Sequence, residues 1–157
     1  MTEDDVIQFV AGLPGVVPIT ASEANGGPED SWGNSFFFYD PNNSLPTNQR
    51  FPFTTIVTKD YEGFDTSSNL NRPGIFRLNM AVGRQRFEEL FGYSPAEHAG
   101  HAQSFDYAAL YQIIPHPMYA VQGWVSIVCP SIRTSQEAGS LITYAHSRAT
   151  ERYRPRA

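Results

Sequence analysis

The order of helical and extended segments constrains the fold of this chain more than any other feature. Apolar spacing predicts a helix over residues 3–13, behind a capping box of Thr2 and Asp5. It also predicts a longer helix over 134–153, behind a capping box of Thr134 and Glu137. Aromatic and β-branched runs between them predict strands at 35–40, 51–57, 75–82 and 123–130, with a short edge strand at 16–20. This order predicts an α+β fold, in which an antiparallel sheet is packed by N- and C-terminal helices as a single-domain sandwich.

Two shorter helical patterns and two polar loops complete the expected organisation. Apolar spacing predicts helices at 83–92 and 105–114. The Gly-rich stretch at 21–34 and the polar stretch at 59–73 are loop insertions of a length that often carries function. Since no repeat or linker divides the chain, residues 1–157 are expected to form one domain.

Composition and charge narrow the functional classes. The net charge is −5, Lys59 is the only lysine, and the only basic cluster is the arginines of 148–156. Nucleic acid is therefore not expected as a partner, since phosphate contacts need a basic face; these arginines are expected to oppose the dipole of the last helix. One cysteine excludes an internal disulfide and a thiolate-rich zinc site. With no membrane span or signal-peptide pattern, a cytoplasmic location is expected.

The strand at 75–82 carries two polar residues where a packed strand would carry apolar ones. Alternation places Arg77 and Asn79 on one face, and Leu78 and Met80 on the other. Burial of an unpaired guanidinium costs several kcal/mol, so that face is either wet or lines a cavity, unless a carboxylate pairs with the arginine. In the functional interpretation, Arg77 and Asn79 anchor an anionic or carbonyl-bearing ligand.

The stretch IIPHPMYAVQGW at 113–124 holds a histidine between two prolines. The prolines restrict the backbone around His116, and a histidine presented in this way suits general acid–base chemistry near neutral pH. Tyr119 adds a polar group and Trp124 an aromatic wall. The structural alternative is a tight corner in which His116 satisfies backbone groups.

Other reactive side chains lack the spacing of a known site. Glu97, His98 and His101 could contribute to a metal site, but a site needs three or four converging ligands, and no HExxH motif is present. No metal or cofactor is therefore predicted. Cys129 ends a predicted buried strand, where cysteines are usually inert.

The motifs FFFYDP, FPFTTIVTKDY, NRPGIFRLNMAVG and IIPHPMYAVQGWVSIVCP carry a resemblance to a known family. The chain resembles, almost end to end, a bacterial domain-of-unknown-function family with a Phe-Pro-Phe strand, Arg-Pro-Gly-Val-Phe-Arg-Leu-Asn, and Pro-His-Pro-Val-Tyr before a Trp-Val strand. Its last third is also distantly similar to the MmcQ/YjbR family, which implies a YjbR-like α+β fold and a suggested DNA-binding role. The chain departs from the domain-of-unknown-function family at two places. Cys129 stands where that family is expected to have Asn, and the loop at 21–34 is longer than usual.

Together these features predict a bacterial protein of secondary metabolism that handles a small molecule without a cofactor. Its pocket is expected on the sheet, under the loop at 21–34. The predicted anchors are Arg77 and Asn79, the predicted proton-transfer residues are His116 and Tyr119, and the predicted aromatic walls are Tyr39 and Trp124.

If the protein is an enzyme, an isomerisation, elimination or cyclisation is expected, because no nucleophile motif is present. The alternative is a non-catalytic module for ligand sequestration or weak nucleic-acid binding through the C-terminal arginines. A homodimer is a further expectation.

Overall fold

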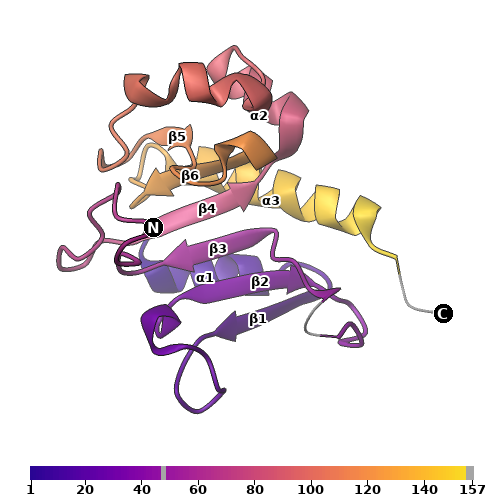
Figure 1. Ribbon diagram of the computed structural model, residues 1–157. Helices are drawn as coiled ribbons and strands as arrows, with labels where there is room; N and C mark the ends of the chain where they lie inside the picture. The colour runs from indigo at the N-terminus through magenta and orange to yellow at the C-terminus, as the bar shows by residue number, and fades with distance from the viewer. Residues whose placement is uncertain (47–48, 155–157) are drawn as a thin grey trace.

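A six-stranded antiparallel sheet forms the centre of the molecule, in the order β1-β2-β3-β4-β6-β5 (Figure 1). The computed structural model describes residues 1–46 and 49–154. Its elements are α1 (Glu3–Ala11), β1 (Val16–Thr20), η1 (Glu29–Ser31), β2 (Ser35–Tyr39), β3 (Thr54–Val57), β4 (Arg77–Ala81), α2 (Gly83–Phe91), η3 (Pro95–Gly100), η4 (Ala102–Ser104), β5 (Ile113–Pro115), η5 (Ala120–Gln122), β6 (Trp124–Val128) and α3 (Ser135–Arg152).

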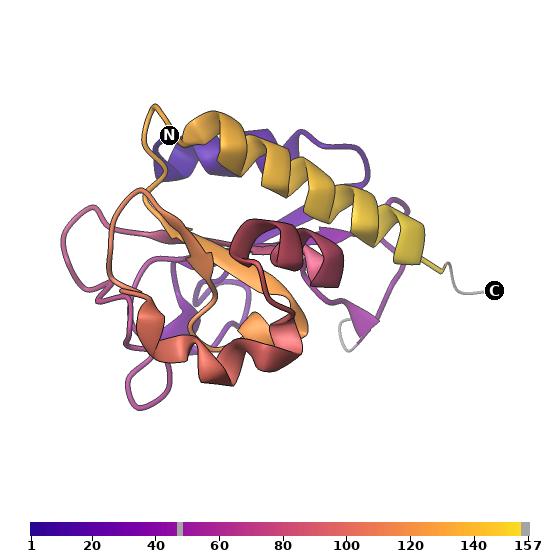
Figure 2. The same ribbon diagram turned by 90° about the horizontal axis from the view of Figure 1, so that it is seen from above.

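Helices α1 and α3 pack together on one face of the sheet, as the view from above shows (Figure 2). The main hydrophobic core lies between them and the inward residues of the strands, which include Leu78 and Met80 of β4 and Ile127 of β6. The α+β prediction, with terminal helices on an antiparallel sheet in one domain, is thereby confirmed. Among the described residues, no helix combines the length and apolar character that a membrane crossing needs.

The prediction of a helix at 105–114 is wrong. This segment instead forms a turn, an isolated bridge between Leu110 and Val128, and the start of β5. Tyr111 takes a φ of 70°, and its N–H donates to the carbonyl of Val128 at 2.8 Å. Pairing with β6 satisfies backbone groups that a short helix would leave free at its ends, so this long-range contact overrides the local helical pattern.

Capping was predicted correctly at one terminal helix and incorrectly at the other. Thr2 and Asp5 form the expected capping box of α1, with Asp5 N donating to Thr2 Oγ1 at 3.1 Å and Thr2 N donating to Asp5 Oδ2 at 2.9 Å. Thr134 precedes α3 but makes no side-chain cap, because its hydroxyl accepts from the N–H of Ser131 at 2.7 Å. The contacts at this end of α3 thus form an ST-type turn rather than a capping box.

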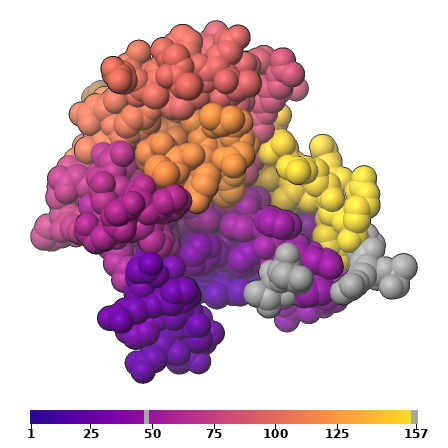
Figure 3. All heavy atoms as spheres, viewed as in Figure 1, coloured from indigo at the N-terminus to yellow at the C-terminus, as the bar shows by residue number. Residues whose placement is uncertain are grey.

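The face of the sheet away from α1 and α3 is covered unevenly. Residues 59–73 lie against this face near β4, and residues 116–124 lie beside them, as the space-filling view shows (Figure 3). The loop at 21–34 contacts the 59–73 loop, since Lys59 Nζ donates to the carbonyl of Glu29 at 3.0 Å. The segment that contacts the polar residues of β4 directly is therefore 59–73, and not 21–34 as expected.

Candidate functional site

The guanidinium of Arg77 is fully buried and paired with a carboxylate. Strand alternation turns Arg77 away from the core, where its Nη2 donates to Asp65 Oδ2 at 2.6 Å and its Nη1 to Asp65 Oδ1 at 3.1 Å. Nη1 also donates to Ser68 Oγ at 2.9 Å, and Nε donates to Asn79 Oδ1 at 2.9 Å. This bidentate geometry satisfies most of the guanidinium donors within the protein.

Asn79 extends this arrangement across three strands. Its Oδ1 also accepts from Ser126 Oγ of β6 at 2.7 Å, and its Nδ2 donates to Thr55 Oγ1 of β3 at 3.0 Å. We call Arg77, Asp65, Ser68, Asn79, Ser126 and Thr55 the buried polar network. The structure thus brings Arg77 and Asn79 together as predicted, but pairs the arginine internally, which corresponds to the carboxylate alternative.

His116 is buried beside this network and is held in one protonation state. Its Nδ1 accepts from the backbone N–H of Met118 at 2.9 Å and of Tyr119 at 3.0 Å. Burial, and then the charge of Arg77, lower the pKa of His116 well below its ordinary value of 6.5. Because Nδ1 accepts two hydrogen bonds, the neutral ring carries its proton on Nε2. That nitrogen can donate a hydrogen bond, but this tautomer leaves it no lone pair with which to act as a base.

Aromatic side chains surround His116 on its outer side. The rings of Tyr119 and Trp124 lie 4.9 and 6.3 Å from the His116 ring, and Phe64 lies 6.5 Å from Tyr119. The structure therefore gathers His116, Tyr119 and Trp124 as predicted. Tyr119 and Phe64 are exposed, whereas His116 is not, so the aromatic rings separate the imidazole from solvent.

Tyr39 lies apart from the other predicted residues. It follows Phe37 by two positions in β2, and Phe37 packs in the core, so Tyr39 faces the helical side of the sheet. Its ring meets His146 of α3 edge to face, with centroids 5.5 Å apart. Tyr39 does not share a site with Arg77 and Asn79.

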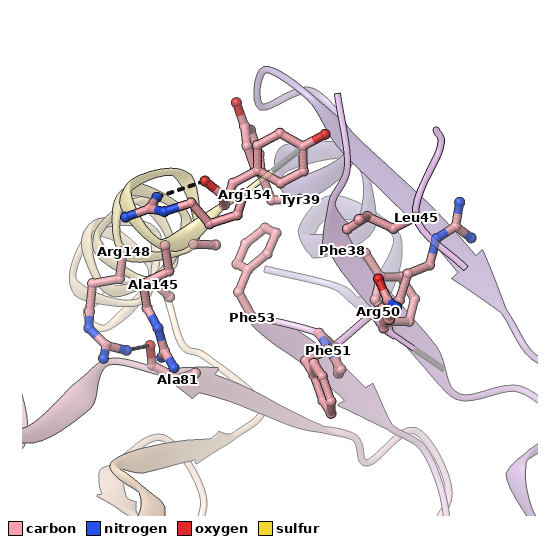
Figure 4. A pocket seen from close by; sticks show the side chains of 15 residues that line it. Phe38, Tyr39, Leu45, Arg50, Phe51, Phe53, Ala81, Ala145, Arg148 and Arg154 are labelled. Carbon is pink, nitrogen blue, oxygen red and sulfur yellow. Dashed lines mark hydrogen bonds between the residues drawn. The ribbon is translucent and has the colours of Figure 1, made fainter. Parts of the chain in front are cut away.

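Tyr39 instead lines a hollow of about 370 Å³ between the last turns of α3 and the segment that joins β2 to β3 (Figure 4). Its walls are aromatic, and Phe51 at its edge is 81% exposed. Arg148 and Arg50 lie on opposite sides of Phe51 and Phe53 in this view. We call this the basic hollow, and its aromatic and basic members are Phe38, Tyr39, Phe51, Phe53, Tyr153, Arg50, Arg148, Arg152 and Arg154.

The arginines of the basic hollow differ in how their charge is balanced. Arg50 pairs with the buried carboxylate of Asp40 at 3.0 Å. Arg148, Arg152 and Arg154 have no carboxylate within 4.0 Å among the described residues. Arg148 Nη1 donates to the carbonyl of Ala81 at 3.0 Å, and Arg154 Nη1 to carbonyls at the end of α3. Three arginines that line the hollow therefore lack a carboxylate partner within the described part of the chain.

The hydroxyl of Tyr153 is the second unbalanced group in the basic hollow. Its oxygen is buried and has no hydrogen-bond partner among the residues that the structure describes. Such groups are rare in folded proteins, because a buried hydroxyl loses its hydration without compensation. A bound ligand with a polar atom at this point would satisfy it.

His98, one of the metal-ligand candidates, is occupied by hydrogen bonds to tyrosines. Its Nδ1 lies 2.8 Å from Tyr93 Oη and its Nε2 lies 3.1 Å from Tyr107 Oη, which itself donates to the carbonyl of Ala102. Burial, and then His101, lower the pKa of His98. Burial, and then Tyr107, raise the pKa of Tyr93 to about 12. Within residues 1–46 and 49–154, no three potential metal-ligating side chains cluster.

The basic hollow is the feature that sequence reasoning missed. Its C-terminal arginines were assigned to the dipole of the last helix or, in the alternative, to weak nucleic-acid binding. One available signal was the spacing of Arg148 and Arg152, which puts both on one face of a helix at i, i+4. No local signal indicates that β2 and the segment before β3 supply the opposite wall.

Comparisons with known proteins show a family of unknown function and a similar fold. Residues 1–157 match the model of a family of unknown function, DUF6194. None of the curated proteins matches the chain. The fold is similar to the crystal structure of Deinococcus radiodurans protein DR2400, with family-model domain DUF419, at a TM-score of 0.55 and 16% identity over 96% of this chain and 80% of that one. At this level of identity the likeness concerns the fold alone.

Proposed function

Because the chain belongs to the DUF6194 family of unknown function, we propose its function from its geometry: the protein binds a small anionic molecule in the basic hollow. The observation that carries this proposal is the set of three arginines, Arg148, Arg152 and Arg154, that line an aromatic-walled hollow and have no carboxylate partner among the described residues. Pockets of about this size commonly hold small molecules, with a few charged groups that fix the ligand.

The local charge favours an anion despite the nearby helix end. The C-terminus of a helix carries a partial charge equivalent to about −0.5. Burial, and then Arg152, lower the pKa of Arg148, while the nearby negative charge of Glu151 raises it by a smaller amount. Three guanidinium groups exceed both contributions, so the hollow keeps a positive potential.

We favour ligand binding as the function, rather than the acid–base catalysis that was predicted for His116 and Tyr119. The Nδ1 atom of His116 accepts two backbone hydrogen bonds, which removes the free lone pair that a general base needs. Arg77 is buried and paired with Asp65, and so is not available as a ligand anchor in this conformation. A role in bacterial secondary metabolism and a homodimer stay predictions from the sequence.

The Arg152→Gln/Arg154→Gln variant tests the proposal with adenosine monophosphate and benzoate as probes. We expect at least one probe to bind the native protein and to lose affinity about tenfold or more in the variant, because hydrogen bonds to charged groups contribute about 1.5–3 kcal/mol each. Isothermal titration calorimetry in low-salt buffer measures the change. Both arginines are exposed, so the variant should fold normally.

Arg84→Gln/Arg133→Gln is the matched control, since it removes the same charge from exposed positions outside the basic hollow. It should leave the affinities unchanged. Equal losses in both variants, or no binding of either probe, would contradict the proposal. A ten-nucleotide single strand that binds more than tenfold tighter than adenosine monophosphate would favour the interaction module instead, with a steep dependence on salt.

A further inference from the structure

We propose that the ligand of the basic hollow is an oxyanion attached to a flat ring, and that the Tyr153 hydroxyl is its hydrogen-bond partner. This inference rests on the proposed function and names the chemical class of the ligand. The oxyanion is a phosphate, as in a mononucleotide, or a carboxylate, as in an aryl acid. Both present to guanidinium groups the same planar pairs of oxygen acceptors.

The walls of the basic hollow are flat and held in place by their neighbours. The Tyr39 ring meets the rings of His146 and Tyr153 edge to face, at 5.5 and 5.3 Å. The Phe53 ring also meets that of His146, with centroids 5.6 Å apart. His146 is itself fixed, because its Nε2 donates to the carbonyl of Pro14 at 2.7 Å. Walls that are already ordered lose little conformational entropy when a ring packs against them.

The size of the basic hollow selects a ligand with one ring system. A volume of about 370 Å³ lies near the lower end of the range for small-molecule sites. It accommodates a ring with one charged group. A dinucleotide is too large for it.

The Tyr153 hydroxyl supplies a directional contact that charge alone does not. Tyr153 lines the hollow, and its hydroxyl oxygen is buried without a partner in the described part of the chain. A ring substituent or a ligand oxygen at this point would recover the hydrogen bond that the free protein lacks. Ligand binding would thus remove a cost that the free protein carries.

Tyr153→Phe is the variant that separates this contact from the effect of charge. It keeps the aromatic wall and removes only the hydroxyl. We expect its affinity for the bound probe, adenosine monophosphate or benzoate, to fall about two- to tenfold, as for loss of one neutral hydrogen bond. Its melting temperature should stay unchanged or rise, because no hydrogen bond of the free protein is lost. Tyr111→Phe, at an exposed position outside the hollow, is the control and should bind normally.

The requirement for a ring is tested on the native protein with ring-free counterparts. Adenosine monophosphate should bind at least tenfold tighter than ribose 5-phosphate or inorganic phosphate, or benzoate at least tenfold tighter than acetate. Success with the first pair identifies a phosphate ligand, and success with the second a carboxylate ligand.

The possible failures are distinguishable from failure of the proposed function. Ring-free anions that bind as tightly as ring-bearing ones, with loss in Arg152→Gln/Arg154→Gln, would overturn this inference and leave anion binding in place. Unchanged affinity in Tyr153→Phe would overturn the role of the hydroxyl. If no probe shows arginine-dependent binding, both proposals fall.

Discussion

Replacement of Asp65 with alanine is expected to lower the free energy of unfolding by about 3–5 kcal/mol. Asp65 is the only carboxylate among the described residues that pairs with the fully buried guanidinium of Arg77. Its removal leaves a positive charge in a site from which water is excluded. The hydrogen bonds to Ser68 and Asn79 cannot replace the lost charge. Urea unfolding at pH 7.5, followed by circular dichroism, measures the loss.

Two further variants show whether the unpaired charge is the cause. Glu62→Ala removes an exposed carboxylate from the same loop and should change the stability by less than about 0.5 kcal/mol. Asp65→Ala/Arg77→Met removes both partners and should recover much of the stability lost in Asp65→Ala, because the guanidinium that lacked a partner is gone as well. If the double variant is as unstable as Asp65→Ala, loss of packing in the loop explains the result and our account of the network is wrong.

Stability is expected to fall by about 1–3 kcal/mol as the pH is lowered from 7.5 to 5.5. The pKa values of His98 and His116 are lowered in the folded protein, mainly by burial, from the ordinary value of 6.5. Below that value the unfolded chain therefore binds protons that the folded protein does not, which favours unfolding. Each such histidine contributes up to about 1.4 kcal/mol per pH unit below 6.5. The contribution is absent above pH 6.5, and most carboxyl groups titrate below this window.

His116→Asn isolates the share that belongs to His116. An asparagine Oδ1 can accept the same N–H groups of Met118 and Tyr119, but it does not titrate. We expect near-native stability at pH 7.5 and a visibly smaller loss between pH 7.5 and 5.5. His116→Ala should instead be less stable by about 1–2 kcal/mol at pH 7.5, because both N–H groups lose their acceptor. This deficit should shrink toward pH 5.5, since the variant also lacks the titrating imidazole. A pH dependence in His116→Asn identical to that of the native protein would contradict this explanation.

The parts of the fold that were predictable depend on periodic, local patterns. Alternation along β4 placed Arg77 and Asn79 on the face opposite Leu78 and Met80, as the structure confirms. The helix at 105–114 was wrong because its apolar residues serve pairing with β6, which lies more than ten residues away in the sequence. Short apolar runs fit both structures, and only the tertiary partner decides between them.

The candidate sites were less predictable, because their members come from distant segments. Asp65 lies in a loop with no periodic pattern, so the sequence gives no sign that it pairs with Arg77. The basic hollow joins α3 to the segment before β3, about 100 residues apart in the sequence. Of its members, Tyr39 was predicted as an aromatic wall beside Arg77, but it lies on the other face of the sheet.

The central position of β4 has a consequence for the accuracy of folding. β4 pairs with β6, so roughly 45 residues must be ordered before these two strands meet, and alternative alignments can form during that time. A shift of β4 by one residue would turn the Arg77 side chain into the hydrophobic core and expose Leu78. In a misaligned chain the charged guanidinium of Arg77 would lie among apolar side chains, too far from Asp65 to pair with it. We therefore expect the arginine to select the native alignment kinetically, and a leucine at that position to fold with more heterogeneous strand pairing.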